Sequence, residues 1–467
     1  MGGKPDCTVE YWQVMPDTAV PNSSPVPGDP YLPGEGNSGY RVTRYDLDLD
    51  YRVSTNRLEA TAILSAVSTE RLTRLSLDLA GLVVSKVSVN GTRASKFSQR
   101  DGKLIIKPGM PLAAGASFIV MVRYSGFPHP ARSSWGEVGW EELADGVLVA
   151  GQPSGAPTWF PCDDRPSAKA PFRISISCDQ PYRVLANGTL LSRTARGSRT
   201  VWVYETTEPM APYLATVQIG QYDEQMIAPG PVPQRMLFPR GMLAKAREDF
   251  ADQPRMMNTF SRLFGPYPFA SYTVVVTDDV LEIPLEAHGL SVFGRNHIDG
   301  AGGSERLIAH ELAHQWFGNS VTVGAWCDIW LHEGFACYAE WLWSEDSGAA
   351  SADTLARQQW ARLSRLPQDL LLADPGADRM FDDRVYKRGA LTLHALRLTV
   401  GDELFFAVLR GWAAGHRHGS ISTAAFVEFA AVVSGMAVAP LLQSWLHQES
   451  LPELPLAARG PAATSRP

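Results

Sequence analysis

The chain has 467 residues, of which 45% are hydrophobic, so it is long enough to form two or three domains with large buried cores. Its 42 basic and 49 acidic residues give a net charge of −7, which does not provide the positive surface that a nucleic-acid-binding protein needs. No apolar run approaches the roughly 18–20 residues of a membrane-spanning helix. We therefore expect neither nucleic acid nor a membrane as a partner.

The cysteines and the N-terminus indicate the cellular compartment. The five cysteines are an odd number, and none of them forms a Cys-x-x-Cys pair. This usage favours reduced thiols over a disulfide framework. The first residues lack a basic segment followed by an apolar one, so no signal peptide is expected. Together these features predict a cytoplasmic protein.

The first half of the chain shows the pattern of short strands. Residues 1–38 are rich in Pro, Gly, Ser and Asn, which predicts an irregular or partly disordered N-terminal arm. From Tyr45 to Val53 apolar and polar residues alternate, as in a half-buried strand, and Phe118 to Tyr124 repeats this alternation. The segments between these predicted strands show little helical periodicity, which indicates a β-rich domain over residues 39–222.

Two Asn-Gly pairs interrupt this strand pattern, at Asn90-Gly91 and at Asn187-Gly188. Each pair lies between short apolar runs. Asn-Gly between such runs is the strongest short-range sign of a hairpin. We therefore expect a β-hairpin at both places.

The second half of the chain is predicted to be a mostly helical domain over residues 223–450. Pro229-Gly230-Pro231 is typical of a linker, and Met242 to Phe264 has helical spacing. Tyr272 to Val276 is rich in β-branched residues and predicts a strand. The Pro- and Ala-rich residues 451–467 are expected to form a disordered tail.

A metal-binding pattern lies in this second half. His310 to His314 has the sequence His-Glu-Leu-Ala-His, within a segment of helical character from Ser304 to Phe317. Histidines four positions apart lie on one helical face, so their imidazoles can bind one metal ion. Glu311 is then placed beside the metal, as a general base and not as a ligand. With Ser304 as N-cap and a stop at Gly318, both histidines are predicted to lie in mid-helix.

A second helical segment supplies a carboxylate. Eighteen residues separate His314 from Glu333. Two histidines and one carboxylate leave a fourth tetrahedral position for water, as a catalytic zinc site requires. The residues thus predict one zinc ion per chain, bound by His310, His314 and Glu333. Glu340 lies two turns after Glu333, either as a hydrogen-bond partner of a ligating imidazole or as an ordinary helix carboxylate.

These two segments and the residues between them resemble the zinc core of the aminopeptidase N family of gluzincins, which have a thermolysin-like catalytic domain. His332 stands where this family usually has Asn, which removes no ligand. The resemblance covers about residues 40–448. It rests on His310–His314, Trp316–Asn319, Val321, Thr322, Trp326, Asp328, Trp330, Leu331 and Glu333–Ala336.

The resemblance implies an α+β multidomain fold. An N-terminal, antiparallel and saddle-like β domain is followed by a mostly helical zinc peptidase domain. The larger members of the family continue into a helical C-terminal domain, which this chain lacks. The resemblance therefore implies a more open site, or a site closed by a partner subunit in an oligomer.

The resemblance also implies three further roles. Gln152 lies in the stretch that matches the N-terminal signature of the family, and Glu286 occupies the exopeptidase motif on an edge strand. Both are expected to bind the amino end of a substrate. Tyr386, in Tyr386-Lys387-Arg388-Gly389, is the expected donor to the oxyanion. Arg388 takes the place of the family's lysine.

These observations predict a zinc-dependent aminopeptidase that acts on peptides with a free N-terminus. Ala287 stands where the exopeptidase motif has Asn, which leaves a thermolysin-like endopeptidase on the same site as an alternative. An epoxide hydrolase of the leukotriene type is another, and a non-catalytic peptide-binding protein is a third. The binding protein is disfavoured because all three ligands, Glu311 and Tyr386 are present.

Overall fold

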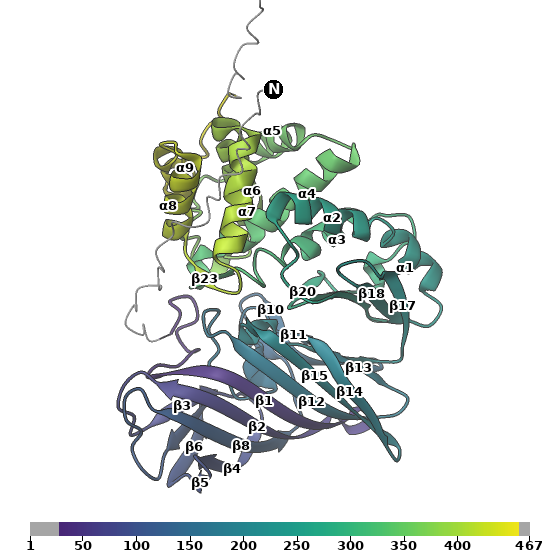
Figure 1. Ribbon diagram of the computed structural model, residues 1–467, viewed down its shortest axis with the longest axis vertical. Coiled ribbons are helices and arrows are strands. Elements are labelled where there is room, and N and C mark those ends of the chain that lie inside the picture. The colour runs from purple at the N-terminus through teal and green to yellow at the C-terminus, as the bar shows by residue number, and fades with distance from the viewer. Residues whose placement is uncertain (1–27, 457–467) are drawn as a thin grey trace, which may run out of the picture.

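The computed structural model describes residues 28–456. Figure 1 shows a β-rich part in the lower half of the view and a mostly helical part above it, with β10, β11 and β20 where the two parts meet. We call these parts the β domain and the catalytic domain. This arrangement agrees with the predicted α+β architecture.

The β domain contains three sheets. An eight-stranded sheet has the order β14-β15-β12-β1-β2-β8-β4-β5, a five-stranded sheet has the order β13-β16-β11-β10-β9, and a three-stranded sheet has the order β3-β7-β6. The strands are β1 Tyr40–Arg52, β2 Arg57–Ser68, β3 Leu75–Asp78, β4 Val83–Val89, β5 Thr92–Arg93, β6 Lys96–Arg100, β7 Lys103–Lys107, β8 Ser117–Gly126, β9 Ala131–Ser133, β10 Gly136–Leu143, β11 Gly146–Ala150, β12 Ala170–Asp179, β13 Arg183–Ala186, β14 Thr189–Arg196, β15 Arg199–Met210 and β16 Val217–Gly220.

Strand β1 follows the predicted alternation, since its apolar side chains are buried and most of its polar ones are not. It differs from the prediction in its pairing. It is antiparallel to β2 but parallel to β12, with Leu47 opposite Ile174, whereas the other strand pairs in the described part of this domain are antiparallel. A long crossover from β1 to β12 allows this parallel pairing, because most of the domain lies between the two strands.

One of the two hairpin predictions is wrong. Asn90-Gly91 connects β4 to β5, and both residues have the positive φ of a tight turn. Asn187-Gly188 instead joins strands of different sheets, because β13 pairs with β16 and β14 pairs with β15. The Asn187 side chain is buried and donates to the carbonyls of Leu214 and His288. This asparagine therefore fixes the crossing between sheets.

The catalytic domain begins where the pairing changes. β17 (Tyr222–Ala228) pairs with β18 (Gln234–Pro239), so the predicted linker at Pro229–Pro231 is the turn of a hairpin. The sheet has the order β17-β18-β19-β21-β20, where β19 is Tyr272–Val276 as predicted, β20 is Leu285–Ala287 and β21 is Leu290–Phe293. β22 (Thr322–Val323) and β23 (Ser420–Ile421) form a parallel pair.

Nine helices are assigned within residues 28–456: α1 Leu243–Asp249, α2 Gln253–Phe264, α3 Glu305–Ala313, α4 Trp330–Ser347, α5 Ala352–Leu363, α6 Asp383–Val400, α7 Asp402–Gly415, α8 Thr423–Ser434 and α9 Ala439–His447. The single helix predicted from Met242 to Phe264 is two helices, α1 and α2. Pro254 lies in the first turn of α2, where a missing N–H is tolerated.

Both termini of the described chain pack on the catalytic domain. Asp29 is buried and accepts a hydrogen bond from Trp326 N at 2.7 Å, so the described part of the arm is irregular but held in place. Leu451 N donates to Gln368, and Pro452 O accepts from Trp360. The predicted disorder of the tail is therefore wrong for Leu451 and Pro452, which these bonds hold on the catalytic domain. Residues 1–27 and 457–467 lie outside the described residues.

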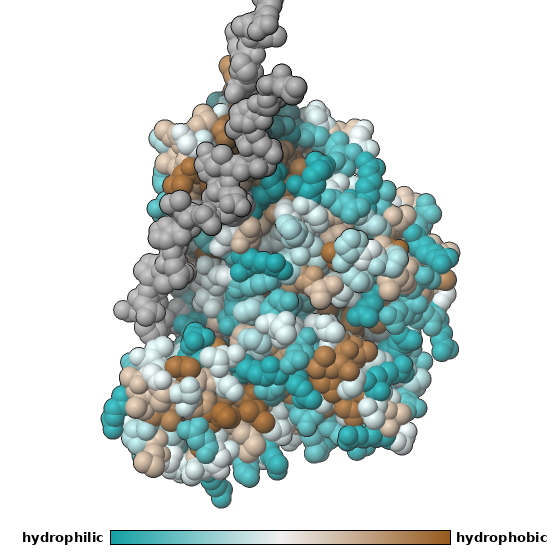
Figure 2. All heavy atoms as spheres, in the orientation of Figure 1, coloured by the Kyte–Doolittle hydropathy of each residue, from teal (hydrophilic) through white to brown (hydrophobic). Residues whose placement is uncertain are grey.

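The surface is mostly polar on the face shown in Figure 2, where apolar residues form separate patches over the β domain. Ile63, Val83 and Ile119 are among the exposed apolar side chains of this domain. Within residues 28–456 no helix combines the length and the apolar character that crossing a membrane requires.

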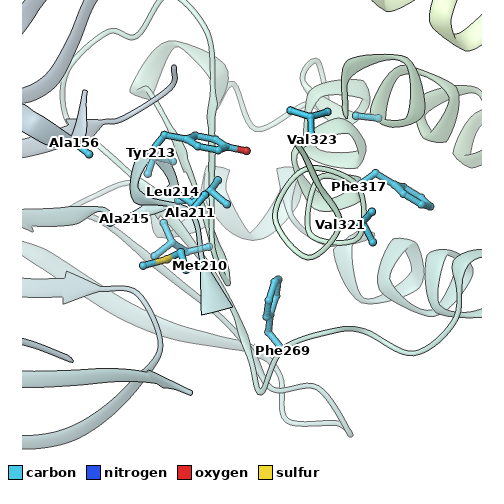
Figure 3. Packing of buried hydrophobic residues seen from close by; sticks show 14 of the residues in the cluster. Ala156, Met210, Ala211, Tyr213, Leu214, Ala215, Phe269, Phe317, Val321 and Val323 are labelled. Atoms are coloured by element: carbon cyan, nitrogen blue, oxygen red, sulfur yellow. The ribbon is translucent and has the colours of Figure 1, made fainter. Parts of the chain in front are cut away.

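The two domains are joined by close side-chain contacts. Figure 3 shows Tyr213 reaching from the β domain towards the segment that carries Val321 and Val323. The Tyr213 hydroxyl donates to Gly318 O at 3.3 Å, and its ring lies 5.0 Å from that of Trp326. This interface lies close to the two predicted histidine ligands, because Gly318 follows the helix that carries them.

Candidate active site

Three side chains predicted to bind a metal ion come together at the N-terminal half of α4 and the C-terminal end of α3. His310 Nε2 lies 3.4 Å from Glu333 Oε2, and His314 Nε2 lies 3.5 Å from the same oxygen. Among the described residues this is the one cluster of three such side chains with ligand atoms within 4.8 Å of one another. All three side chains are buried.

The helix that carries the histidines ends earlier than predicted. α3 stops at Ala313, so His314 lies at its C-terminal boundary and not in mid-helix. Beyond it the chain makes wider turns, in which Asn319 N donates to His314 O at 2.9 Å and Val321 N donates to Trp316 O at 3.0 Å. The segment folds back on the last helical turn, and Gly318 allows this because its φ is +129°.

Each histidine is oriented through its second ring nitrogen. His310 Nδ1 donates to Glu340 Oε1 at 2.8 Å, and His314 Nδ1 donates to Phe317 O at 3.1 Å. These bonds leave both Nε2 atoms as acceptors that face Glu333, which is the tautomer a metal ligand needs. The predicted role of Glu340 as the partner of a ligating imidazole therefore agrees with this geometry.

Two cations balance Glu340, and the sequence analysis did not identify either. Arg306 Nη1 lies 3.0 Å from both carboxylate oxygens of Glu340, and Lys387 Nζ lies 3.9 Å from one of them. Although burial opposes ionisation, His310 and the two cations hold the pKa of Glu340 below its usual range. Arg306 precedes His310 by one helical turn, and this spacing is the sequence feature that could have placed Arg306 near the partner of His310.

Glu311 lies beside the cluster and is buried, and its Oε2 has no hydrogen-bond partner. Burial raises the pKa of this carboxyl group. Such an orphaned oxygen next to two acceptor imidazoles and a carboxylate fits a bound cation and a water molecule. Two nitrogens and one carboxylate oxygen are the ligand set of a catalytic zinc ion.

Tyr386 is brought to this cluster by close packing of α4 against α6. The Cα of Gly389 lies 2.7 Å from where a Cβ on Gly334 would be, so only glycine fits at this crossing. The Tyr386 ring lies 6.1 Å from that of His310 and nearly parallel to it. Burial and the nearby carboxylates raise the pKa of the phenol well above its usual range, so it remains a hydrogen-bond donor.

Gln152 and Glu286 also meet, although 134 positions separate them in sequence. Gln152 Nε2 donates to Glu286 Oε1 at 2.8 Å, across the boundary between the domains. Glu286 lies on edge strand β20, as predicted, opposite Ser291 of β21. Burial raises the pKa of Glu286. Both side chains keep part of their surface accessible, unlike the buried ligand cluster.

Two further side chains that the sequence analysis missed hold β20 in place. Gln315 accepts from Gly289 N at 2.9 Å and donates to Ala287 O at 3.2 Å. Asn319 Nδ2 donates to Ala287 O at 2.9 Å. The strand of Glu286 is therefore bonded to the segment that follows α3, which carries the predicted histidine ligands. Both residues lie in the stretch that carries the family resemblance, but only the tertiary structure shows that their side chains bind the backbone around β20.

His332 and Arg388, which depart from the family pattern, bind backbone. His332 Nε2 accepts from Val323 N at 2.8 Å, so this residue supports β22 and leaves the metal ligands intact. Arg388 is buried, and its guanidinium donates to the carbonyls of Trp445 and Glu449 at the end of α9. Arg388, which takes the place of the family's lysine, therefore contacts the end of α9.

Comparison with known proteins places the chain in a family. A model described as the peptidase M1 N-terminal domain matches residues 42–214, and one described as the peptidase family M1 domain matches residues 249–445. The fold is similar to the crystal structure of an M1 zinc metallopeptidase from Deinococcus radiodurans bound to a Tyr-Ser-Ala substrate, with a TM-score of 0.85 and 30% identity over 93% of this chain and 100% of that one. The chain belongs to peptidase family M1.

Other members of family M1 are similar over most of the chain. A two-domain M1 zinc metallopeptidase bound to L-arginine is 31% identical, with a TM-score of 0.84 over 93% of this chain. A leucyl aminopeptidase from Saccharolobus solfataricus is 24% identical over 90% of this chain, which spans 55% of that protein. The M1 zinc metallopeptidases indicate a zinc cofactor for this chain, and the ligand set of His310, His314 and Glu333 fits it.

Proposed function

We propose that this M1 chain is a zinc-dependent aminopeptidase, which removes the first residue from peptides with a free N-terminus. The hydrogen bond between Gln152 and Glu286 carries the proposal. It supports a subsite for an ammonium group, because a partly accessible carboxylate with a raised pKa is stabilised when a cation binds beside it. The names of the M1 relatives support the same activity.

The roles of the chain's residues follow from their positions. A zinc ion held by His310, His314 and Glu333 would supply a Lewis acid that acidifies water and polarises a carbonyl group. Glu311 Oε2 takes a proton from the attacking water and delivers it to the leaving amine nitrogen. The Tyr386 hydroxyl donates a hydrogen bond to the developing oxyanion. Glu286 and the amide oxygen of Gln152 hold the substrate ammonium.

The test is hydrolysis of aminoacyl fluorogenic amides, each measured beside its N-acetylated twin. We expect the parent protein to cleave only the free amines and to lose activity with a chelator. Glu311→Gln should keep its zinc but lose about 10²–10⁴-fold in kcat, because proton transfer is removed. Near-parental turnover by a purified, zinc-loaded Glu311→Gln sample would contradict the mechanism.

The ammonium subsite needs a separate comparison. Glu286→Gln is expected to raise KM for the free amines much more than Glu282→Gln, which removes an exposed charge from the segment just before β20. Equal cleavage of acetylated and free substrates would favour the endopeptidase alternative. Zinc binding without hydrolysis of any substrate in the panel would favour the peptide-binding alternative.

We also propose a cytoplasmic location. The four cysteines that the structure describes are all free, and three of them are buried, which supports a reducing environment. The division into a β domain and a catalytic domain near residue 222 is supported by the change of strand pairing there. The partly accessible positions of Gln152, Glu286 and Tyr386 support a site that is open to peptides.

A further inference from the structure

Lys169 belongs to the β domain, immediately before β12, but its ammonium group lies in the catalytic domain. Its Nζ is 2.8 Å from Ser320 O, 2.9 Å from Thr322 Oγ1, 3.2 Å from Gly419 O and 3.3 Å from Asn319 O. All four partners are uncharged oxygens. Burial lowers the pKa of the Lys169 amine to about 7. The four bonds to oxygen compensate for the water that the amine loses, so they fix the group in place.

The oxygens that bind Lys169 belong to the turn that orients His314. Thr322 Oγ1, which accepts from Lys169, itself donates to Gly318 O at 2.7 Å. The neighbouring carbonyl of Phe317 accepts from His314 Nδ1 at 3.1 Å. Gly318 N donates to Val321 O at 2.8 Å and closes the turn. Hydrogen bonds thus connect Lys169 to Thr322 and Thr322 to Gly318, and the adjacent residue Phe317 accepts from the imidazole of His314.

We propose that Lys169 is a positioning residue for the metal site, which holds the turn of residues 317–322 and thereby the orientation of His314. Zinc retention then depends on contact between the two domains. The inference rests on the proposed function only in taking His314 as a zinc ligand. Tyr213, which donates to Gly318 O from the same β domain, contacts the turn beside Lys169.

The contacts of Lys169 thereby favour one orientation of the His314 imidazole. Without the ammonium group, the carbonyls of Asn319 and Ser320 lose a donor at the domain interface, and the turn relaxes towards other arrangements. Phe317 O then no longer fixes His314 Nδ1. Loss of such an outer partner of a ligating histidine typically costs about 10–100-fold in metal affinity.

The experiment measures the zinc dissociation constant by competition with a chromophoric chelator, on the full-length protein. Lys169→Met keeps the aliphatic stem and removes the hydrogen-bond donor, and we expect its zinc to bind about 10–100-fold more weakly. Glu340→Gln, which removes the direct partner of His310, is the positive comparison. Arg388→Met is the matched control, because it also deletes a buried cation bound to carbonyls. Its zinc affinity is expected to stay within about threefold of the parent.

Thr322→Val provides a second test that does not depend on burying a new side chain at position 169. It removes the hydroxyl that connects Lys169 to Gly318 O, and we expect several-fold weaker zinc binding. Combined with Lys169→Met, the two losses should overlap and not multiply. Parental zinc affinity in both single variants, or an equal loss in Arg388→Met, would overturn the inference. A parent protein that binds no zinc would overturn the proposed function as well.

Discussion

Of three cationic side chains near the site, two share one partner and the third has another. Arg306 and Lys387 face Glu340, and Arg388 binds carbonyls at the end of α9. The sequence identified Glu340 from helical spacing, because two turns of α4 bring it to the same face as Glu333. It did not identify Arg306 or the target of Arg388, since a charge alone does not reveal which neighbour a long flexible side chain reaches.

Glu35 is a single residue whose ionisation is expected to affect stability. Burial and the charge of Asp78, which is bound to Lys103, raise the pKa of Glu35 from 4.5 to about 7. Between these values the folded protein binds a proton that the unfolded chain has released, so the free energy of unfolding falls as the pH rises. Above pH 7 Glu35 is ionised in the folded protein as well, and the decrease in the free energy of unfolding is complete.

Glu35→Gln removes this titration. We expect the variant to be more stable than the parent at pH 8, by on the order of 1–2 kcal/mol, and equally stable at pH 4. Urea unfolding at both pH values measures the difference. Glu70→Gln, which changes an exposed carboxylate of the same domain, should match the parent at both. A Glu35→Gln variant that is no more stable at pH 8 than at pH 4, relative to the parent, would contradict the assignment.

At the scale of elements, local pattern predicted the existence of most helices and strands better than their ends. The strand at Tyr272–Val276 lies where its β-branched residues predicted it. α3 ends four residues before Phe317, the predicted end of the helix, because Gly318 folds the chain back to meet Lys169 and β20. The end of this helix is set by tertiary partners, and helix-capping patterns carry no information about them.

The crossing of α4 and α6 gives an element-scale prediction. In Gly389→Ala the new Cβ would meet Gly334 Cα at 2.7 Å, so the helices must separate. We expect a loss of about 1–3 kcal/mol in the free energy of unfolding, as for other overpacked sites. Because α6 carries Tyr386 and α4 carries Glu333, kcat should also fall. Thermal unfolding and hydrolysis assays measure the two effects.

Gly415→Ala is the control for this substitution. Gly415 ends α7, and the nearest atom to its added Cβ is 4.0 Å away, so alanine fits. Alanine has the higher helix propensity, and the variant is expected to be as stable as the parent or slightly more stable. A Gly389→Ala variant with parental stability would show that the two helices tolerate a wider separation.

At the scale of the whole molecule, the metal site connects α3 to α4, and Lys169 connects the same region to the β domain. Removal of zinc should therefore lower the melting temperature. At a free zinc concentration of about 100 Kd, binding contributes about 2.7 kcal/mol, and each kcal/mol corresponds to about 2–4 °C for a domain of this size. We expect a decrease of roughly 5–10 °C in calorimetry after chelation, reversed by added zinc.

His310→Ala separates this effect from unspecific stabilisation by zinc. The variant lacks one ligand, so its melting temperature should not respond to chelator or to micromolar zinc. Equal zinc-dependent shifts in the parent and in His310→Ala would place the stabilising ion elsewhere.

Sequence patterns alone predicted the candidate ligand set and the order of the two domains. Histidines at i and i+4 are a local pattern of one helix, and alternation is a local pattern of one strand. The carboxylate comes from a second helical segment that lies close by in the sequence. The tertiary structure decided the contacts of Gln152 with Glu286, of Lys169 with Ser320 and of Asn187 with Leu214. These contacts join distant segments of the chain. Their partners are set by how sheets and domains pack together, which no local periodicity encodes.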